Sequence, residues 1–308
     1  MALALLGGLA AWFVLGRDSA PACNGLPENK RVQQSLGAGV KPGMSCAALG
    51  EVIVEATTGS KPGVHSRQQA QALKDVLFEL GSTQPEDLTI DPALRLPLAT
   101  ALADYAPDVH ELLVTLDSKY ILEGDRTKPP WESEGTYHLA VYNTMFRHIV
   151  RAVSEDPEAY ALLRTAETRQ VANGLAAVPR DAKDAAFSLP ATKGARALGV
   201  LDGIATVVLQ GLDEDEAKAW RVTVVKGVAR GLDAPVEGKD QAGEAFAAVW
   251  LQEFEKTPEA ERFDRLSTQG VDLTRIWLKS RNTDETAQQA LLGEVESSAL
   301  GGAREVTH

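Results

Sequence analysis

The stretch from residue 120 to residue 151 holds more side chains capable of chemistry than any other part of the chain. Three of the five tyrosines and two of the five histidines fall in it. Glutamate and histidine can act as acid and base, and tyrosine and tryptophan often form binding surfaces. The catalytic candidates are Glu132, Glu134 and His138. The binding candidates are Tyr120, Trp131, Tyr137 and Tyr142.

A helix predicted over residues 133–154 places Glu134 and His138 on one face, because they are four residues apart. His138 then falls in the apolar stripe of that helix, together with Met145 and Ile149. A buried histidine beside a glutamate can be an acid–base pair with shifted pKa values. The ordinary alternative is a core histidine hydrogen-bonded to Glu134 or Tyr142.

A hydrolase acting on cell-wall glycan would need two carboxylates flanking a cleft, about 5 Å apart for retaining chemistry. Glu132 and Glu134 lie where the predicted loop becomes a helix, so one of them could serve as such an acid. Glutamates are also common in the first turn of a helix, where they interact with its dipole.

Motifs for other chemistry are absent from the sequence. It contains no H-E-x-x-H, G-x-S-x-G, P-loop or G-x-G-x-x-G pattern, and its two cysteines are too few for a zinc ribbon. We therefore expect no metal and no cofactor. The balance of these observations favours a non-catalytic protein.

The elements that must position these residues are predicted to be helices. Alanine, leucine, glutamine and glutamate dominate the periodic stretches, and alternating runs typical of strands are almost absent. The predicted fold is all-α, a multi-helix, bundle-like ectodomain that follows an apolar export segment. A formal net charge of −12 argues against binding of nucleic acid.

Residues 2–16 read ALALLGGLAAWFVLG and carry no charge. As a helix they span about 22 Å, shorter than the roughly 30 Å apolar core of a bilayer. Such a length, followed by an A-x-A pattern at residues 20–22, is typical of a signal peptide. Residues 1–22 are therefore a signal peptide or a membrane anchor. Both place the rest outside the cytoplasm, secreted or tethered to the outer face of the cytoplasmic membrane through residues 2–16 alone.

Cys23 and Cys46, the only cysteines, follow this segment closely. In an oxidising compartment they should form a disulfide. The alternative is lipidation of Cys23, which would leave Cys46 free. The residues before Cys23 match a lipidation signal poorly, because Ala20 stands where an aliphatic residue is usual.

Proline and glycine divide the rest of the chain. We predict a disulfide-stapled linker at 23–64, an N-terminal helical part at 65–123, a proline-rich connection at 124–132, a main helical domain at 133–300 and a mobile tail at 301–308.

Two pairs of glycines, Gly199 with Gly203 and Gly227 with Gly231, have the spacing of close helix contacts. Such contacts serve either packing within the domain or self-association. The leading functional hypothesis is a binding or interaction module of the bacterial cell envelope, with an unknown protein or envelope component as partner. The alternatives are the hydrolase described above and a secreted helical effector.

Overall fold

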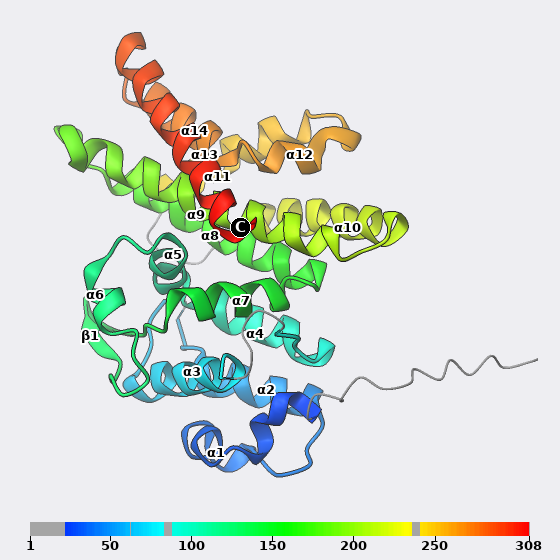
Figure 1. Cartoon of the computed structure of the whole chain (residues 1–308). Helices are drawn as coiled ribbons and strands as arrows, with labels where there is room; N and C mark the ends of the chain where they lie inside the picture. The colour runs from blue at the N-terminus through cyan, green and yellow to red at the C-terminus, as the bar shows by residue number, and fades with distance from the viewer. Residues whose placement is uncertain (1–21, 62, 83–87, 236–240, 308) are drawn as a thin grey trace, which may run out of the picture.

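The computed structural model describes residues 22–61, 63–82, 88–235 and 241–307, which fold into packed helices with a single two-stranded sheet (Figure 1). The predicted all-α class is confirmed. The expected export segment lies outside the described residues. Within the described ranges, no helix is long and apolar enough to cross a membrane.

The N-terminal elements are η1 (Ala22–Glu28), α1 (Lys30–Leu36), η2 (Gly37–Gly39), α2 (Cys46–Thr57), α3 (Arg67–Leu80), α4 (Pro92–Asp104), α5 (Ala106–Val114) and α6 (Ser118–Leu122). The sheet consists of β1 (Trp131–Ser133) and β2 (Thr136–His138). The remaining elements are α7 (Asn143–Val153), α8 (Pro157–Ala177), α9 (Asp184–Gln210), α10 (Glu214–Asp233), α11 (Gln241–Glu255), η4 (Glu259–Glu261), α12 (Arg262–Leu266), α13 (Gln269–Ser280) and α14 (Glu285–Thr307).

The predicted disulfide between Cys23 and Cys46 is present, with the two Cα atoms 5.1 Å apart. It joins η1 to the first residue of α2. Residues 23–64, where a linker region was predicted, contain η1, α1, η2 and α2, and α1 packs against α3 while α2 packs against α4. Leu49 and Ile53 on α2 are fully buried. Apolar residues at helical spacing therefore fold this segment into the core.

Capping residues fix several of the helix starts. Ser66 and Gln69 form the predicted capping box at the start of α3, and Asp91 caps α4 with a proline directly after it. Proline inside a helix often interrupts it, but α4 is continuous through Pro97. Gly50 on α2 lies so close to Pro97 that an added Cβ would be 2.6 Å from the proline ring.

Both glycine pairs are used for packing within the chain. A Cβ at Gly199 or Gly203 would lie 2.1 or 2.4 Å from the backbone of α14. A Cβ at Gly227 or Gly231 would be within 2.7 Å of side chains on α8. Both glycine faces are thus occupied within the chain, and self-association through these pairs stays a prediction.

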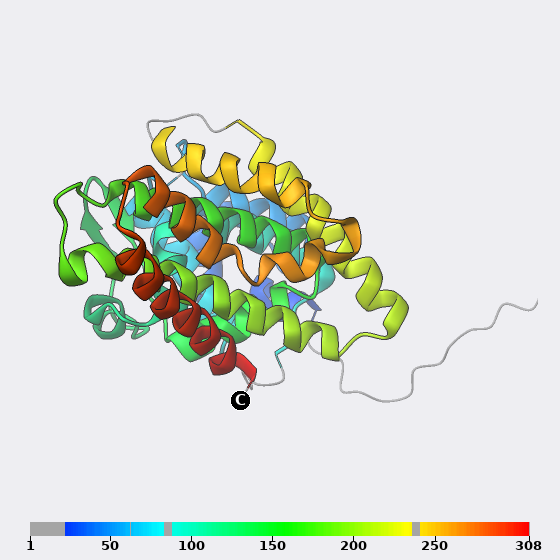
Figure 2. The same cartoon turned by 90° about the horizontal axis from the view of Figure 1, so that it is seen from above.

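Residues 301–307, where a mobile tail was predicted, form the last turns of α14. Figure 2 shows α14, in red, lying across the helices of the C-terminal half. Gly302 is buried against Arg196 on α9, and Glu305 forms ion pairs with Arg147 and Arg196. Gly301 and Gly302 are the first two residues of this segment. They allow α14 to lie close to α9.

The proline-rich connection at 124–132 is not helical, as predicted. Buried residues before and after it belong to one hydrophobic cluster, which includes Leu102 on α4 and Leu201 on α9. The core is therefore continuous past this segment, and the division of the chain there stays a prediction.

Candidate functional site

The segment with the predicted site residues forms a β-hairpin. Glu134 and Gly135 are the two turn residues, with φ angles of 52° and 81°. Two successive positive φ values are typical of the tight turns that join antiparallel strands. The expected helix over 133–154 is therefore wrong in its first part, since α7 begins only at Asn143. Glu134 and His138 consequently share no helical face.

The register of the hairpin separates the predicted catalytic residues. Trp131 pairs with His138, and Glu132 pairs with Tyr137. Paired side chains lie on the same face of a sheet, and successive residues lie on opposite faces. Glu132 thus lies on the face opposite to His138, and both Glu132 and Glu134 are exposed.

Asp108 on α5 is the acceptor at the centre of the site. His138 Nδ1 lies 2.7 Å from Asp108 Oδ1, and the Tyr120 hydroxyl donates to the same oxygen. The backbone N–H of Leu139 donates to Asp108 Oδ2 at 3.2 Å. Only 3% of the Asp108 side chain is exposed. A buried carboxylate with three donors is fully satisfied, so this cluster fixes the hairpin to α5 and α6.

The charges of the cluster follow from these contacts. The hydrogen bond with Asp108 raises the pKa of His138 above its ordinary value of 6.5, although burial opposes the shift. Burial and the nearby Asp108 raise the pKa of Tyr120 above 10.0. The raised pKa favours the protonated form of His138 beside Asp108, and the Tyr120 hydroxyl keeps its proton and donates.

An aromatic ring covers one face of His138. The Trp131 ring is stacked on it, with centroids 5.7 Å apart and planes at 24°. Tyr120 meets the edge of Trp131 at 5.0 Å, and the Lys119 ammonium lies 4.9 Å from the Trp131 ring. These contacts favour the ordinary interpretation of His138 as a partly buried, hydrogen-bonded histidine, with Asp108 as its partner in place of Glu134 or Tyr142.

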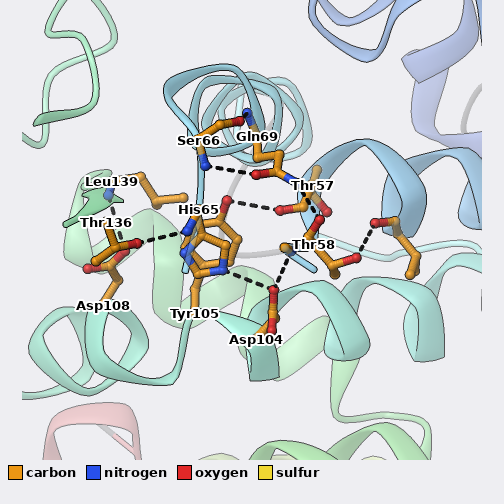
Figure 3. A network of polar contacts seen from close by, with 12 residues as sticks. Thr57, Thr58, His65, Ser66, Gln69, Asp104, Tyr105, Asp108, Thr136 and Leu139 are labelled. Atoms are coloured by element: carbon orange, nitrogen blue, oxygen red, sulfur yellow. Dashed lines mark hydrogen bonds and ion pairs between the residues drawn. The ribbon is translucent and has the colours of Figure 1, made fainter. Parts of the chain in front are cut away.

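A second histidine, His65, also contacts strand β2 (Figure 3). The His65 backbone N–H donates to Thr136 Oγ1 at 2.8 Å, and its carbonyl accepts from the Tyr137 N–H at 3.0 Å. The His65 ring lies 2.9 Å from Asp104 Oδ2 and is stacked on Tyr105, with centroids 3.5 Å apart. Asp104 and Asp108 lie one helical turn apart near the α4–α5 junction, so one region of the chain supplies both carboxylates.

An open hollow lies next to this cluster, between the end of α5, α6 and the start of α7. Its volume is about 150 Å³. Two of the predicted binding residues, Tyr120 and Tyr142, line it, whereas Trp131, Tyr137 and the three catalytic candidates do not. The lining residues are Glu111, Leu112, Thr115, Tyr120, Ile121, Val141, Tyr142 and Asn143.

Apolar side chains are exposed around this hollow. Ile121 is 58% exposed, Leu122 is 70% exposed and Leu116 is 56% exposed. Tyr142 is 49% exposed, and its hydroxyl donates to Asp125 at 2.6 Å. Neighbouring apolar residues exposed to this degree are typical of interaction sites.

Comparisons with known proteins do not identify the chain. No protein-family model, curated protein or solved structure matches it. Every functional argument therefore rests on the residues of this chain.

The described residues offer little for metal chemistry. Within this part of the chain, no three histidine, cysteine, aspartate or glutamate side chains lie close enough together to hold a metal ion.

The sequence analysis missed the residues that organise the site. Asp104, Asp108 and His65 are distant in sequence from the hairpin, and their pairing depends on how α5 packs. The four-residue spacing of the two aspartates was a signal that could have shown that both point to the same side.

Proposed function

We propose that this protein is a non-catalytic interaction module of the bacterial cell envelope, which binds a partner protein at the hollow between α5, α6 and α7. The observation that carries the proposal is the exposure of Ile121 and Tyr142, which line that hollow. Leu116 and Leu122, each the next residue after a lining residue, are exposed as well. An isolated exposed leucine would have no functional meaning, but several together beside a concave site favour a docked partner.

The size of the hollow suggests what enters it. An apolar cavity of about 150 Å³ holds a six-membered ring such as benzene. The hollow here is similar in volume, and its walls include Leu112, Ile121 and Val141. We infer that one leucine-sized or phenylalanine-sized side chain of the partner inserts there, with Leu116 and Leu122 covering its flanks.

The charge of the surroundings suggests basic residues on the partner. Between residues 115 and 142 there are five acidic and three basic side chains. Two of the basic groups are already engaged, because Arg126 pairs with Glu79 and Lys119 lies over Trp131. A partner segment with lysine or arginine beside its apolar anchor would therefore associate faster.

The hydrolase hypothesis has no such support. It requires carboxylates that face each other across a cleft. Glu132 and Glu134 are exposed on the hairpin, and neither lines the hollow. A secreted effector would use the same binding surface as an envelope interaction module. These two interpretations differ only in where the protein is found.

An extracytoplasmic location is part of the proposal. The disulfide between Cys23 and Cys46 supports it, because disulfides persist mainly in oxidising compartments. Fractionation of native cells with intact mass measurement, without reductant, tests it. A membrane-bound species that keeps residues 1–22 indicates a tethered module. A soluble species that begins at Cys23, two hydrogens lighter than its reduced form, indicates a secreted protein.

The binding surface is tested by photo-cross-linking in native cells, with the reactive residue placed at Leu122 or at Val249. Val249 on α11 is a matched control, because it is also an exposed aliphatic residue, at 42%. We expect a specific cross-linked partner at Leu122 alone.

The identified partner is then purified and its affinity measured. Burial of one large aliphatic side chain contributes about 1.5–3 kcal/mol, so Ile121→Asp should weaken binding at least about tenfold. Val249→Asp should leave the affinity unchanged. Equal cross-linking at both positions, or equal affinity of both variants, would contradict the proposal.

A further inference from the structure

A second hollow lies between the C-terminal half of α9 and the α12 segment, with α8 behind it. Its volume is about 310 Å³, near the lower end of the range for small-molecule sites. Its lining combines two carboxylates, two aromatic rings and two hydroxyls. These residues are Asp202, Asp264, Tyr160, Phe263, Thr206 and Ser267.

Asp202 is held in place by an arginine that is fully buried. Arg164 Nη1 donates to Asp202 Oδ1 and to the Tyr160 hydroxyl. Its Nε donates to Gln269 Oε1 at 2.9 Å, and its Nη2 donates to the Leu266 carbonyl at 2.6 Å. All three guanidinium nitrogens are therefore used inside the protein.

Only the carboxylate of this ion pair reaches the hollow. The Arg164 side chain is 0% exposed, whereas the Asp202 side chain is 20% exposed. Burial disfavours the charged guanidinium, but Asp202 and Tyr160 outweigh this effect and raise the pKa of Arg164. A buried ion pair contributes little net stability, because the loss of hydration offsets the attraction. Its clearest consequence here is a carboxylate with a fixed orientation at the hollow.

Aromatic rings form one wall beside this carboxylate. The ring centroids of Tyr160 and Trp220 are 4.9 Å apart, and those of Trp220 and Phe263 are 5.8 Å apart. Tyr160 and Phe263 both line the hollow. Aromatic faces attract cations, and Arg221 already lies 5.8 Å from the Phe263 ring without lining the hollow.

The arginines of α12 do not neutralise the site. Arg262 donates to the carbonyls of Thr257 and Glu255. Arg265 forms an ion pair with Asp272 at 2.8 Å. No lysine or arginine side chain is among the lining residues. Arg164 balances the charge of Asp202 from inside the protein, and Asp264 is a second, exposed carboxylate of the lining.

We propose that this hollow binds a small organic ammonium ion, with Asp202 and Asp264 as its hydrogen-bond acceptors and Tyr160 and Phe263 as its aromatic wall. The ammonium belongs either to a free alkylamine or to a lysine side chain of another protein. This inference is independent of the proposed docking surface on α5, α6 and α7.

In the test, each probe is titrated into the full-length protein, and binding is monitored through the amide chemical shifts of Thr206 and Ser267. The probes are n-butylammonium, Nα-acetyl-lysine methylamide as the lysine side chain, and n-butanol as the neutral control. Because a hydrogen bond between two charged groups is stronger than one made by a neutral hydroxyl, n-butylammonium should bind about tenfold or more tightly than n-butanol. Tighter binding of the lysine probe would indicate a protein ligand, and tighter binding of n-butylammonium a free amine.

Variants identify the residues responsible. Asp202→Asn keeps the shape of the side chain and should weaken n-butylammonium binding about tenfold. Asp264→Asn and Phe263→Leu leave Arg164 paired, so they test the site even if the first variant folds poorly. Each should weaken binding severalfold. Asp215→Asn, an exposed aspartate in the first turn of α10, is the matched control and should have no effect.

The proposal is overturned by several outcomes. These are the absence of saturable shifts at Thr206 and Ser267, equal binding of n-butanol and n-butylammonium, and unchanged binding in both Asp264→Asn and Phe263→Leu.

Discussion

Replacement of Asp108 by asparagine should reveal how much the hairpin depends on one buried carboxylate. Asp108 accepts from His138, from Tyr120 and from the backbone of Leu139. Asparagine keeps the shape of the side chain but removes its charge. Its NH₂ group would also face a hydrogen-bond donor where a carboxylate oxygen now accepts. Each hydrogen bond to a charged group contributes about 1.5–3 kcal/mol, and removal of one partner of a buried ion pair costs about 3–5 kcal/mol. Because one asparagine oxygen can still accept, we expect a loss of about 3 kcal/mol in the free energy of unfolding.

This loss should depend on pH. The pKa of His138 is raised in the folded protein, so its ion pair with Asp108 contributes fully below the unfolded pKa of about 6.5. The contribution is lost as the pH rises through the folded-state pKa of His138. The difference in stability between the wild type and Asp108→Asn should therefore be largest near pH 6 and become smaller at higher pH.

Urea denaturation followed by circular dichroism at several pH values measures both effects. Glu132→Gln is the matched control, because it neutralises an exposed carboxylate in the same hairpin. It should change stability by no more than about 0.5 kcal/mol. If Asp108→Asn lost less than about 1 kcal/mol, or if the loss did not change with pH, the ion pair would not hold the hairpin as described.

Two further predictions concern packing and burial elsewhere. Gly302→Ala should destabilise the protein by about 1–3 kcal/mol, because the added Cβ would lie 2.3 Å from the Arg196 carbonyl oxygen. The control is Gly293→Ala on the same helix, whose added Cβ meets no atom within 4 Å. It should instead stabilise the protein by up to about 1 kcal/mol. Equal effects of the two variants in urea denaturation would contradict the α9–α14 contact. The pKa of Lys74 should be about 8 rather than 10.5, since burial disfavours its charge. The carbon resonance next to its amine reports this value in a pH titration, and an ordinary lysine pKa would refute the burial.

Local sequence patterns were sufficient to predict helix starts and buried helix faces that depend only on neighbouring residues. The capping box at Ser66 and Gln69 and the acidic cap at Asp213 stand where the spacing placed them. The apolar stripe of residues 145–153 also forms the buried face of α7. Each signal depends on hydrogen bonds or periodicity within a few residues, so the sequence is sufficient to specify it.

The hairpin could not be predicted in this way. Its strands are three residues long, and the helical periodicity of α7 appeared to extend back through them. His65 and Asp108 stabilise the extended conformation through backbone contacts that are distant in sequence. A contact of this kind outweighs local helix propensity, which is only a few tenths of a kcal/mol per residue.

The role of the glycine pairs was also ambiguous in the sequence, because it depends on a contact that is distant in sequence. Spacing showed that Gly199 and Gly203 lie on one helical face, but the helix that approaches that face is α14 of the same chain.

The sequence by itself determined the all-α class and the disulfide between Cys23 and Cys46, because composition, periodicity and the presence of only two cysteines are properties of the chain alone. Only the tertiary structure decided which carboxylate holds His138 and which apolar residues remain exposed beside the hollow. These outcomes depend on how helices far apart in sequence pack together. The residue types within any single segment do not specify that packing.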